Sequence, residues 1–327
     1  MLTELSIKNF RSLQDVPALT LGKINVITGQ NNGGKTSLLE AVYFLLAKRN
    51  QLSLFPKVFR DAQEKPPENF RHFWLWLFKD RNPSQYPISI IAKGFDDPMV
   101  FAGGLGGPQE SSAIRIWYST PIPGQQPHPA INIQQNGNIQ PTTANLAEHT
   151  TTTMLAFSPK QDTPAETAAK FTKLSVRAGV EEKLLELLKK VAPELAKLRY
   201  LKITEEPLVY AGTSLPLLVP TTQMGQAFNR LFNLYMDLLS ARANVLLIDE
   251  IENGLHHSVY VDVWKGIAAL AHAENVQIFA TTHNKDCLRA ALEASLEIAD
   301  NSFRHIRATS NNGVVQLASS PDILMAQ

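Results

Sequence analysis

The sequence is poor in cysteine, in net charge and in long hydrophobic runs, and each shortage excludes a class of protein. Cys287 is the only cysteine among 327 residues, so a disulfide within the chain and a thiolate metal cluster are both excluded. The 31 Lys and Arg against 30 Asp and Glu give a net charge of +1, so any nucleic-acid surface must be local. No run reaches about 18 apolar residues, and Glu4 and Lys8 interrupt the place of a signal-peptide core. We therefore expect a cytoplasmic protein without membrane association.

A proline-rich middle separates two parts of the chain in which strands and helices alternate. Residues 50–160 hold many of the 20 prolines between strand-like pieces, which predicts an antiparallel β lobe, and 161–204 predict a helical insertion. Apolar strands alternate with helices in 1–49 and 205–327, which predicts a parallel core sheet flanked by helices. The expected fold is α/β, with one domain over 1–327. We expect strands at 2–10, 23–28, 244–249, 276–282, 303–308 and 313–317, and helices at 35–48, 223–241, 256–273 and 284–294.

The nine residues GQNNGGKTS follow a buried strand and precede an amphipathic helix. Gly29, Gly34, Lys35 and Thr36 match the pattern G-x-x-x-x-G-K-[ST], in which glycines let backbone amides surround an anion at the start of a helix. The lysine reaches the β- and γ-phosphates, and the threonine hydroxyl is a hard oxygen ligand for Mg²⁺. The alternative is a glycine-rich turn that matches by chance. The predicted nucleotide-binding residues, for ATP with Mg²⁺, are Gly29, Gln30, Asn31, Asn32, Gly33, Gly34, Lys35, Thr36 and Ser37.

The segment VLLIDEIENG places two acidic residues directly after four apolar residues of a second buried strand. Ligands of open α/β sheets bind at the carboxyl ends of strands. Asp249 is therefore predicted to hold Mg²⁺, and Glu250 to orient or deprotonate the attacking water. A further apolar strand ends in His283, which is predicted to donate a hydrogen bond to the γ-phosphate. Each strand end alone is consistent with a solvated surface, but their order after the glycine loop favours a hydrolytic site.

Together these pieces resemble the ABC-type ATPases of the SMC/RecF/OLD group, and within it the AAA family ATPases near the OLD and AbiEii-like proteins. The opening LSIKNFRSLQD is similar to that group's first strand, DEIENGLHHS to its acidic strand and D-loop, and TTHN to its switch-histidine motif. The resemblance covers roughly 1–49 and 205–300. It implies a P-loop NTPase with a two-lobed head, and a dimer in which two heads enclose two ATP molecules and complete each other's sites.

The resemblance also implies roles for residues outside these motifs. The segment PTTQMGQ stands where the family has a signature that contacts the γ-phosphate across the dimer, although QMG replaces the usual Ser-Gly pair. The predicted signature residues are Thr222, Met224, Gly225 and Gln226. Arg11 is implied as a phosphate contact, with a surface role as the alternative, and Arg230 is either a second phosphate contact or part of a helix-face ion pair. The Q-loop glutamine stays open between Gln85 and Gln161.

Two departures from the family narrow the expected role. The chain between Lys35 and Asp249 is too short to hold a long coiled coil, and no Toprim nuclease domain fits after the last predicted strand. We therefore expect an ATPase whose homodimer or higher oligomer regulates a DNA-related or anti-phage defence process through a separate nuclease or toxin. The alternative is an ATP-sensing scaffold with slow hydrolysis that holds or releases such a partner. Lys189, Lys190, Lys197 and Arg199 predict either a DNA-contacting face or a solvated helix face.

Overall fold

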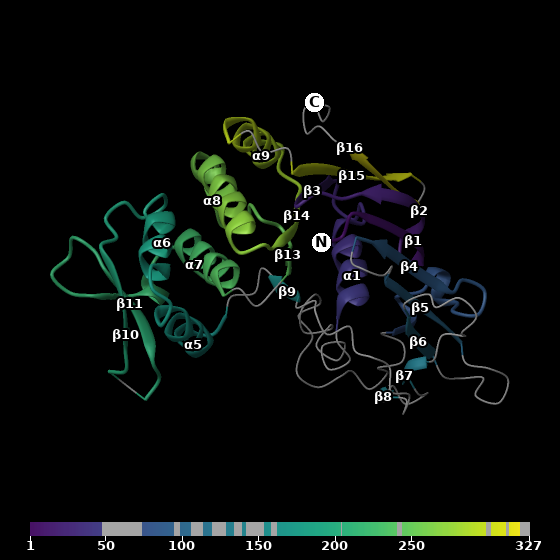
Figure 1. The fold of residues 1–327 in the computed structure, drawn as a ribbon, viewed down its shortest axis with the longest axis horizontal. Coiled ribbons are helices and arrows are strands. Elements are labelled where there is room, and N and C mark those ends of the chain that lie inside the picture. The colour runs from purple at the N-terminus through teal and green to yellow at the C-terminus, as the bar shows by residue number, and fades with distance from the viewer. Residues whose placement is uncertain are drawn as a thin grey trace.

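Two large sheets, with helices between and beside them, make up the computed structural model of the chain (Figure 1). The structure describes residues 1–47, 74–94, 99–105, 114–119, 129–133, 139–141, 154–157, 162–203, 205–240, 244–298, 302–311 and 314–320. Gln161, one of the two Q-loop candidates, lies outside these ranges. No helix within them is long and apolar enough to cross a membrane.

A six-stranded sheet forms the core that carries the glycine loop. From edge to edge its strands are β16 (Val314–Ser320), β15 (Phe303–Asn311), β3 (Ile24–Gly29), β14 (Gln277–Thr282), β13 (Val245–Ile248) and β9 (Met154–Phe157). Neighbouring strands are parallel except β16, which forms an antiparallel hairpin with β15. The predicted parallel sheet is confirmed, and its central strands are the buried apolar runs that a sheet covered on both faces requires. The assignment of 154–157 to the antiparallel lobe is wrong, because these four residues pair in parallel with β13.

A seven-stranded antiparallel sheet forms the second layer. Its strands are, in order, β2 (Leu13–Thr20), β1 (Glu4–Phe10), β4 (Ile88–Lys93), β5 (Met99–Leu105), β6 (Ile114–Ser119), β7 (Pro129–Ile133) and β8 (Ile139–Pro141). The expected strand at 2–10 forms as β1, which lies between β2 and β4 and is antiparallel to both. The first 49 residues therefore do not all belong to the nucleotide-binding sheet, because β1 and β2 build the lobe.

Helices cover both faces of the parallel sheet (Figure 1). They are α1 (Lys35–Leu46), α5 (Pro164–Ser175), α6 (Val180–Leu188), α7 (Gln226–Leu239), α8 (Tyr260–Ala273) and α9 (Lys285–Glu297), with short 3₁₀ turns at Lys79–Arg81 (η1), Thr221–Gln223 (η3) and His257–Val259 (η4). At the start of α5, Thr163 and Glu166 form a capping box, in which each side chain accepts a hydrogen bond from the other's backbone N–H.

A small sheet of β10 (Lys197–Leu201), β11 (Leu208–Gly212) and β12 (Val219–Pro220) follows α6, where the sequence predicts helix up to residue 204. Leu198 faces the core, and the exposed Lys197 and Arg199 alternate with it, which is the period of a strand. The predicted basic helix face is therefore wrong, because Lys189 and Lys190 follow α6 whereas the other two cations stand on β10.

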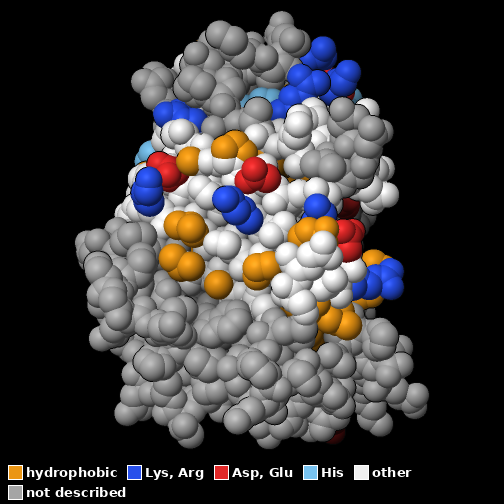
Figure 2. Space-filling model, turned by 90° about the vertical axis from the view of Figure 1, so that its right-hand side faces the viewer, with side chains coloured by type: hydrophobic (Ala, Val, Ile, Leu, Met, Phe, Trp, Pro, Cys, Tyr) orange, Lys and Arg blue, Asp and Glu red, His pale blue; other side chains and the backbone are white. Residues whose placement is uncertain are grey.

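Two hydrophobic clusters, one on each face of the parallel sheet, hold α1 and the other helices in place. On one face, the Phe44 ring of α1 lies 5.8 Å from that of Phe10 and 5.5 Å from that of Phe101, so α1 is fixed between the two large sheets. The other face packs against α5 to α9. Figure 2 shows charged side chains of both signs and apolar side chains interspersed over the described part of one outer face, in keeping with the balanced charge of the chain.

Candidate nucleotide-binding and hydrolytic site

The glycine loop connects β3 to α1 and needs its glycines for steric reasons. Gly29 has φ +155° and lies against β15, so a Cβ there would be 2.4 Å from the carbonyl oxygen of Ala308. Gly34 has φ +86°, and a Cβ there would be 2.8 Å from Val315. Asn32 also has a positive φ of 61°. The loop can therefore turn tightly and present its amides at the N-terminus of a 12-residue helix, where the helix dipole favours an anion.

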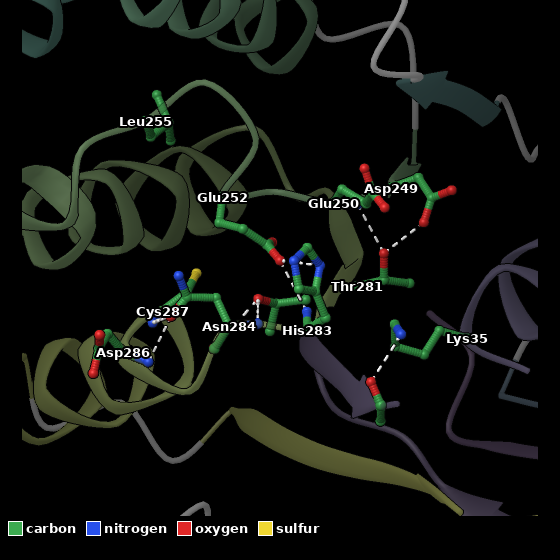
Figure 3. Close-up of polar contacts among 12 residues, drawn as sticks. Lys35, Asp249, Glu250, Glu252, Leu255, Thr281, His283, Asn284, Asp286 and Cys287 are labelled. Atoms are coloured by element: carbon green, nitrogen blue, oxygen red, sulfur yellow. Dashed lines mark hydrogen bonds and ion pairs between the residues drawn. The ribbon is translucent and has the colours of Figure 1, made fainter. Parts of the chain in front are cut away.

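Lys35 begins α1 and is 92% buried, with 8% of its surface exposed. Its Nζ donates to the carbonyl oxygens of Gly29 at 2.8 Å and Gln30 at 3.0 Å, which folds the side chain back over the loop (Figure 3). Burial lowers the pKa of Lys35, against the opposing attraction of Asp249 and Glu252. A desolvated cation beside the loop amides is well suited to attract a phosphate group.

Asp249 follows β13 and lies directly opposite the start of α1. The Thr36 hydroxyl donates to its Oδ2 at 3.2 Å, across 213 positions of the chain. Thr281, at the end of β14, donates its hydroxyl to Asp249 Oδ1 at 2.6 Å and accepts from the backbone N–H of Glu250 at 2.8 Å. One threonine hydroxyl therefore holds both acidic residues, and the ends of three adjacent strands meet at one point (Figure 3).

The backbone of Glu250 is held in the left-handed region, with φ 50°. Such a conformation is unfavourable for a non-glycine residue and persists only where the surroundings impose it. The N–H of Glu250 donates to Thr281, and its carbonyl oxygen accepts from Arg230 Nη2 at 2.5 Å. The same nitrogen donates to the carbonyl oxygen of Asp249 at 3.1 Å.

Arg230 lies on α7 and is 6% exposed. Its guanidinium supports the backbone of the acidic pair, a role that neither sequence interpretation included, and the phosphate contact and the ion pair stay predictions. Burial lowers the pKa of Arg230, and the nearby Glu252 and Glu250 oppose that shift.

His283 follows β14 and has a buried carboxylate as its partner. The Nδ1 atom of its ring and its backbone N–H both lie 2.9 Å from Oε1 of Glu252. The side chain of His283 is 51% exposed, whereas that of Glu252 is 6% exposed. The next residue, Asn284, caps α9 by accepting from the backbone N–H groups of Asp286 and Cys287. The turn that carries His283 is therefore fixed on both sides.

The residues around Thr36 fit a magnesium ion. The Thr36 hydroxyl and the Asp249 carboxylate are hard oxygen donors that already face one another. Within the described ranges no group of three or more His, Cys, Asp or Glu side chains could hold a metal alone. A pair of protein oxygens such as Thr36 and Asp249 suits Mg²⁺, which is commonly bound by one or two protein oxygens together with phosphate oxygens and water.

A groove of about 1030 Å³ lies beside the P-loop and is lined by Gln30, Asn31 and His283, among others. Lys35, Thr36 and Asp249 are not among its lining residues. Gly33 donates its N–H to the carbonyl oxygen of Gln30 at 3.0 Å, and Ser37 is buried in the first turn of α1. The groove is of the size that nucleotide-like ligands occupy, and it places the loop and His283 around one space.

The predicted signature segment lies at the start of α7, away from the contacts of Lys35 and Asp249. Gly225 is the N-cap of α7, and a Cβ added to it would meet nothing within 4 Å. Met224 packs against the helical core, Thr222 lines a small cavity of about 140 Å³, and Gln226 lies close to Gly254. None of the four signature residues makes a hydrogen bond to the glycine loop or to Asp249 within the described chain.

Arg11 forms an ion pair with α1. Its Nε lies 2.5 Å from Oε2 of Glu40, a fully buried carboxylate on α1, and its side chain is 15% exposed. The ion pair ties the turn between β1 and β2 to α1, and the phosphate contact of Arg11 stays a prediction. The remaining Q-loop candidate, Gln85, stands in an exposed turn and accepts from Asn82.

Two family models match separate parts of the chain. "AAA ATPase domain" matches residues 1–85, and "AAA domain, putative AbiEii toxin, Type IV TA system" matches 180–286. Among solved structures, an Smc head bound to the C-terminal winged-helix domain of ScpA aligns over 98% of this chain and 97% of its own, with a TM-score of 0.60 at 13% identity. A Pyrococcus furiosus Smc head has a TM-score of 0.57, also at 13% identity. Both family models describe AAA-type ATPase domains, and the fold is that of Smc heads.

Curated relatives of the ATPase are either similar over a short segment or distant over the whole length. An ATP/GTP phosphatase of Helicobacter pylori is 20% identical over 88% of this chain and 86% of its own length. An uncharacterised protein of Methanocaldococcus jannaschii is 41% identical, and the RecF replication and repair protein of a Shewanella species is 54% identical. The matches cover only 28% and 12% of those two proteins, and 19% and 14% of the ATPase.

Sequence reasoning missed Thr281 and Glu252, two residues of the ATPase that the structure places inside the site. Thr281 belongs to the TTHN segment and Glu252 to DEIENG, so both stand within motifs already singled out. The sequence offered one indication of each: Thr281 is a hydroxyl residue two positions before His283, and Glu252 is a carboxylate three positions after Asp249. Their importance became visible only from their partners in space.

Proposed function

We propose that the glycine loop and the acidic pair form a single Mg²⁺-dependent ATP site. Lys35 and the loop amides bind the β- and γ-phosphates, and Thr36 and Asp249 would hold the metal, which neutralises developing charge when bound. Glu250 orients or deprotonates the attacking water, and His283 contacts the γ-phosphate. The observation that carries this proposal is the 3.2 Å contact between Thr36 and Asp249, because it joins the two predicted motifs at one point.

ATP binding would bring two heads together, each supplying its signature segment to the other's nucleotide. The Smc-head fold supports this proposal, as does the position of Gly225 at a helix N-terminus with open space around it. Among the described residues of one head the segment makes no hydrogen bond to the glycine loop, and in this proposal a second copy brings it to the phosphate.

The ATP-dependent dimer would regulate a DNA-related or anti-phage defence process in the cytoplasm, through a separate nuclease or toxin. Two similarities favour this role: the AbiEii-type model over 180–286, and the RecF match over 44 residues. Binding assays of the purified ATPase with the products of neighbouring genes, and with DNA, would identify the effector and any DNA contact.

Glu250→Gln tests the catalytic proposal, because the amide keeps the shape of the side chain but removes its charge. The variant should bind ATP with Mg²⁺ as tightly as wild type, lose hydrolysis and elute as a dimer in size-exclusion chromatography. Lys35→Ala is the matched control, which should fail to bind ATP and stay monomeric. Wild-type turnover by Glu250→Gln would remove this residue from the mechanism.

The second candidate function is an ATP-sensing scaffold with slow hydrolysis. Met224 and Gly225 in place of the family's Ser-Gly pair favour it, because the side chain of Met224 cannot donate to phosphate. A pull-down from the native host with and without ATP separates the two functions. A stable ATP-dependent partner with negligible free ATPase activity indicates the scaffold, whereas rapid turnover indicates the hydrolytic switch.

A further inference from the structure

The groove beside the P-loop is lined by cations and by no acidic side chain. Lys285 and Arg289 of α9 line it together with Arg307 of β15, and its described lining residues include no Asp or Glu. The side chains of His283 and His305 line it as well. In a chain with 31 basic and 30 acidic residues, this is a local excess of positive charge. A concave site with one sign of charge attracts ligands of the opposite sign, so the groove favours an anion.

The cations of the groove are available to a ligand. Lys285 and Arg307 are exposed, and neither forms an ion pair with a residue that the structure describes. Arg289 has its Nη1 atom 3.4 Å from Oδ1 of Asp286, but the two side chains are 72% and 65% exposed. An exposed pair of this kind contributes little stability, so the guanidinium of Arg289 can turn to another anion.

The wall between β3 and β15 is a fixed hydrogen-bonding surface. His305 is 4% exposed, and its Nε2 atom lies 2.6 Å from Oγ1 of Thr28 on the neighbouring strand. Burial lowers the pKa of His305, and the charge of Arg307 lowers it further, so the ring is neutral at neutral pH. The charge that a ligand meets in this part of the groove therefore comes from the arginine rather than from the histidine.

Another part of the groove is apolar. Leu288 and Leu292 stand one turn apart on α9, and both line the groove together with Ala308 of β15. Gln30 and Asn31 add side-chain amides that can donate and accept hydrogen bonds. The volume of about 1030 Å³ is at the upper end of the range for small-molecule sites. Cations, an apolar surface and amides within one such space suit a nucleoside phosphate, which has a charged group and a flat base.

This groove is not the space in which the phosphates of ATP are proposed to bind. Lys35, Thr36 and Asp249 do not line it, although Gln30 and Asn31 belong to the same loop. The helix α1 packs on one face of the parallel sheet and α9 on the other. The groove lies at the carboxyl ends of strands, where the connecting helices leave to opposite faces, and ligands of open α/β sheets bind at such points.

We propose that the groove is a second ligand site of the ATPase, which binds a nucleoside phosphate, either free or as one unit of a single-stranded nucleic acid. The phosphate contacts Lys285 and Arg307, and the base lies against Leu288 and Leu292. The inference goes beyond the proposed ATP site, because binding in the groove requires neither Lys35 nor Mg²⁺.

Isothermal titration calorimetry of Lys35→Ala without Mg²⁺ tests the groove, because this variant should not bind ATP at the glycine loop. The probes are AMP, a short oligothymidylate and inorganic phosphate. Adding Lys285→Gln and Arg307→Gln to Lys35→Ala should weaken the binding of AMP or oligothymidylate about 100-fold, since each charged hydrogen bond contributes about tenfold or more. The matched control adds Lys189→Gln and Lys190→Gln instead, which removes two exposed cations next to α6 and should change the affinity less than about twofold.

A variant that fills the groove tests its position independently of charge. Thr309 is exposed on β15 and lines the groove, so the indole of Thr309→Trp should occupy the space and abolish binding with all cations present. Binding of AMP would identify a free nucleotide as the ligand, and binding of oligothymidylate alone would identify a nucleic-acid strand. The proposal is overturned if neither probe binds, if the groove variants bind as tightly as Lys35→Ala alone, or if inorganic phosphate binds as tightly as the nucleoside phosphates.

The titration needs no turnover, so it distinguishes two kinds of failure. If wild type does not hydrolyse ATP but Lys35→Ala shows binding that depends on Lys285 and Arg307, the proposed function fails while the second site stands. If wild type hydrolyses ATP and no such binding is measured, the second site fails alone.

Discussion

Arg230→Met should destabilise the protein and slow hydrolysis together, because one buried guanidinium holds two carbonyl groups of the catalytic loop. Methionine keeps the aliphatic bulk but leaves the carbonyl oxygens of Asp249 and Glu250 without their donor. Hydrogen bonds from charged donors contribute about 1.5–3 kcal/mol each. Since a single nitrogen makes both contacts, we expect a loss of about 3 kcal/mol in the free energy of unfolding. For a chain of this size that corresponds to a fall in Tm of about 5 °C.

The strained backbone of Glu250 would relax once Arg230 no longer holds it, so kcat should fall about 100-fold, the cost of a displacement near 1 Å. Urea titration measures the stability and a phosphate-release assay measures turnover. Arg230→Lys is the control, because an ammonium can serve one carbonyl but lacks the planar fork, and it should lie between wild type and the Met variant. If Arg230→Met unfolds at the wild-type urea concentration and turns over normally, the supporting role of this arginine is refuted.

Three further predictions address the glycine loop, Thr281 and the buried Asp237 of α7, which pairs with Lys170. Gly29→Ala should abolish ATP binding, because its Cβ would lie 2.4 Å from a carbonyl oxygen of β15. Gly225→Ala, whose Cβ would meet nothing within 4 Å, should leave the ATP affinity of the monomer unchanged, and equal calorimetric affinities for the two variants would contradict this. Thr281→Val should weaken Mg²⁺-dependent ATP binding and lower kcat, because Asp249 and the N–H of Glu250 lose the hydroxyl that they share. Turnover across a Mg²⁺ titration measures both effects, and curves equal to those of wild type would exclude this role of Thr281. Burial raises the pKa of Asp237 from 3.8 to about 6, so the stability contributed by its protonated form is complete below pH 4 and lost as the pH rises through 6. Wild type should therefore lose stability relative to Asp237→Asn between pH 4 and 7, and parallel urea midpoints would rule this out.

The parts of the fold that local pattern determines were predictable from the sequence. The buried runs of β13 and β14 and the helical period of α1 each carry their signal within a few residues. The glycine-rich pattern likewise marks the loop in the sequence, although the contacts that exclude a Cβ at Gly29 and Gly34 come from β15 and β16. These elements place the three strand ends that form the site.

The parts that depend on distant partners were not predictable. The strand β9 is only four residues long, and nothing in its composition indicates that it pairs in parallel with β13. Arg230 is an ordinary helical arginine in sequence, and its role follows from two carbonyl groups about 20 positions away. Arg11 likewise matches the family motif, yet its charge pairs with Glu40 inside the fold. Partners in space, rather than residue type, decide what these side chains do.

The central claim is that one Mg²⁺·ATP lies between the glycine loop and the acidic pair. A crystal structure of Glu250→Gln with Mg²⁺ and a non-hydrolysable ATP analogue tests it most directly. The account predicts that Lys35 leaves the carbonyl oxygens of Gly29 and Gln30 to contact phosphate, with the metal beside Thr36 and Asp249. A triphosphate bound elsewhere, with Lys35 still folded onto its own loop, would contradict it.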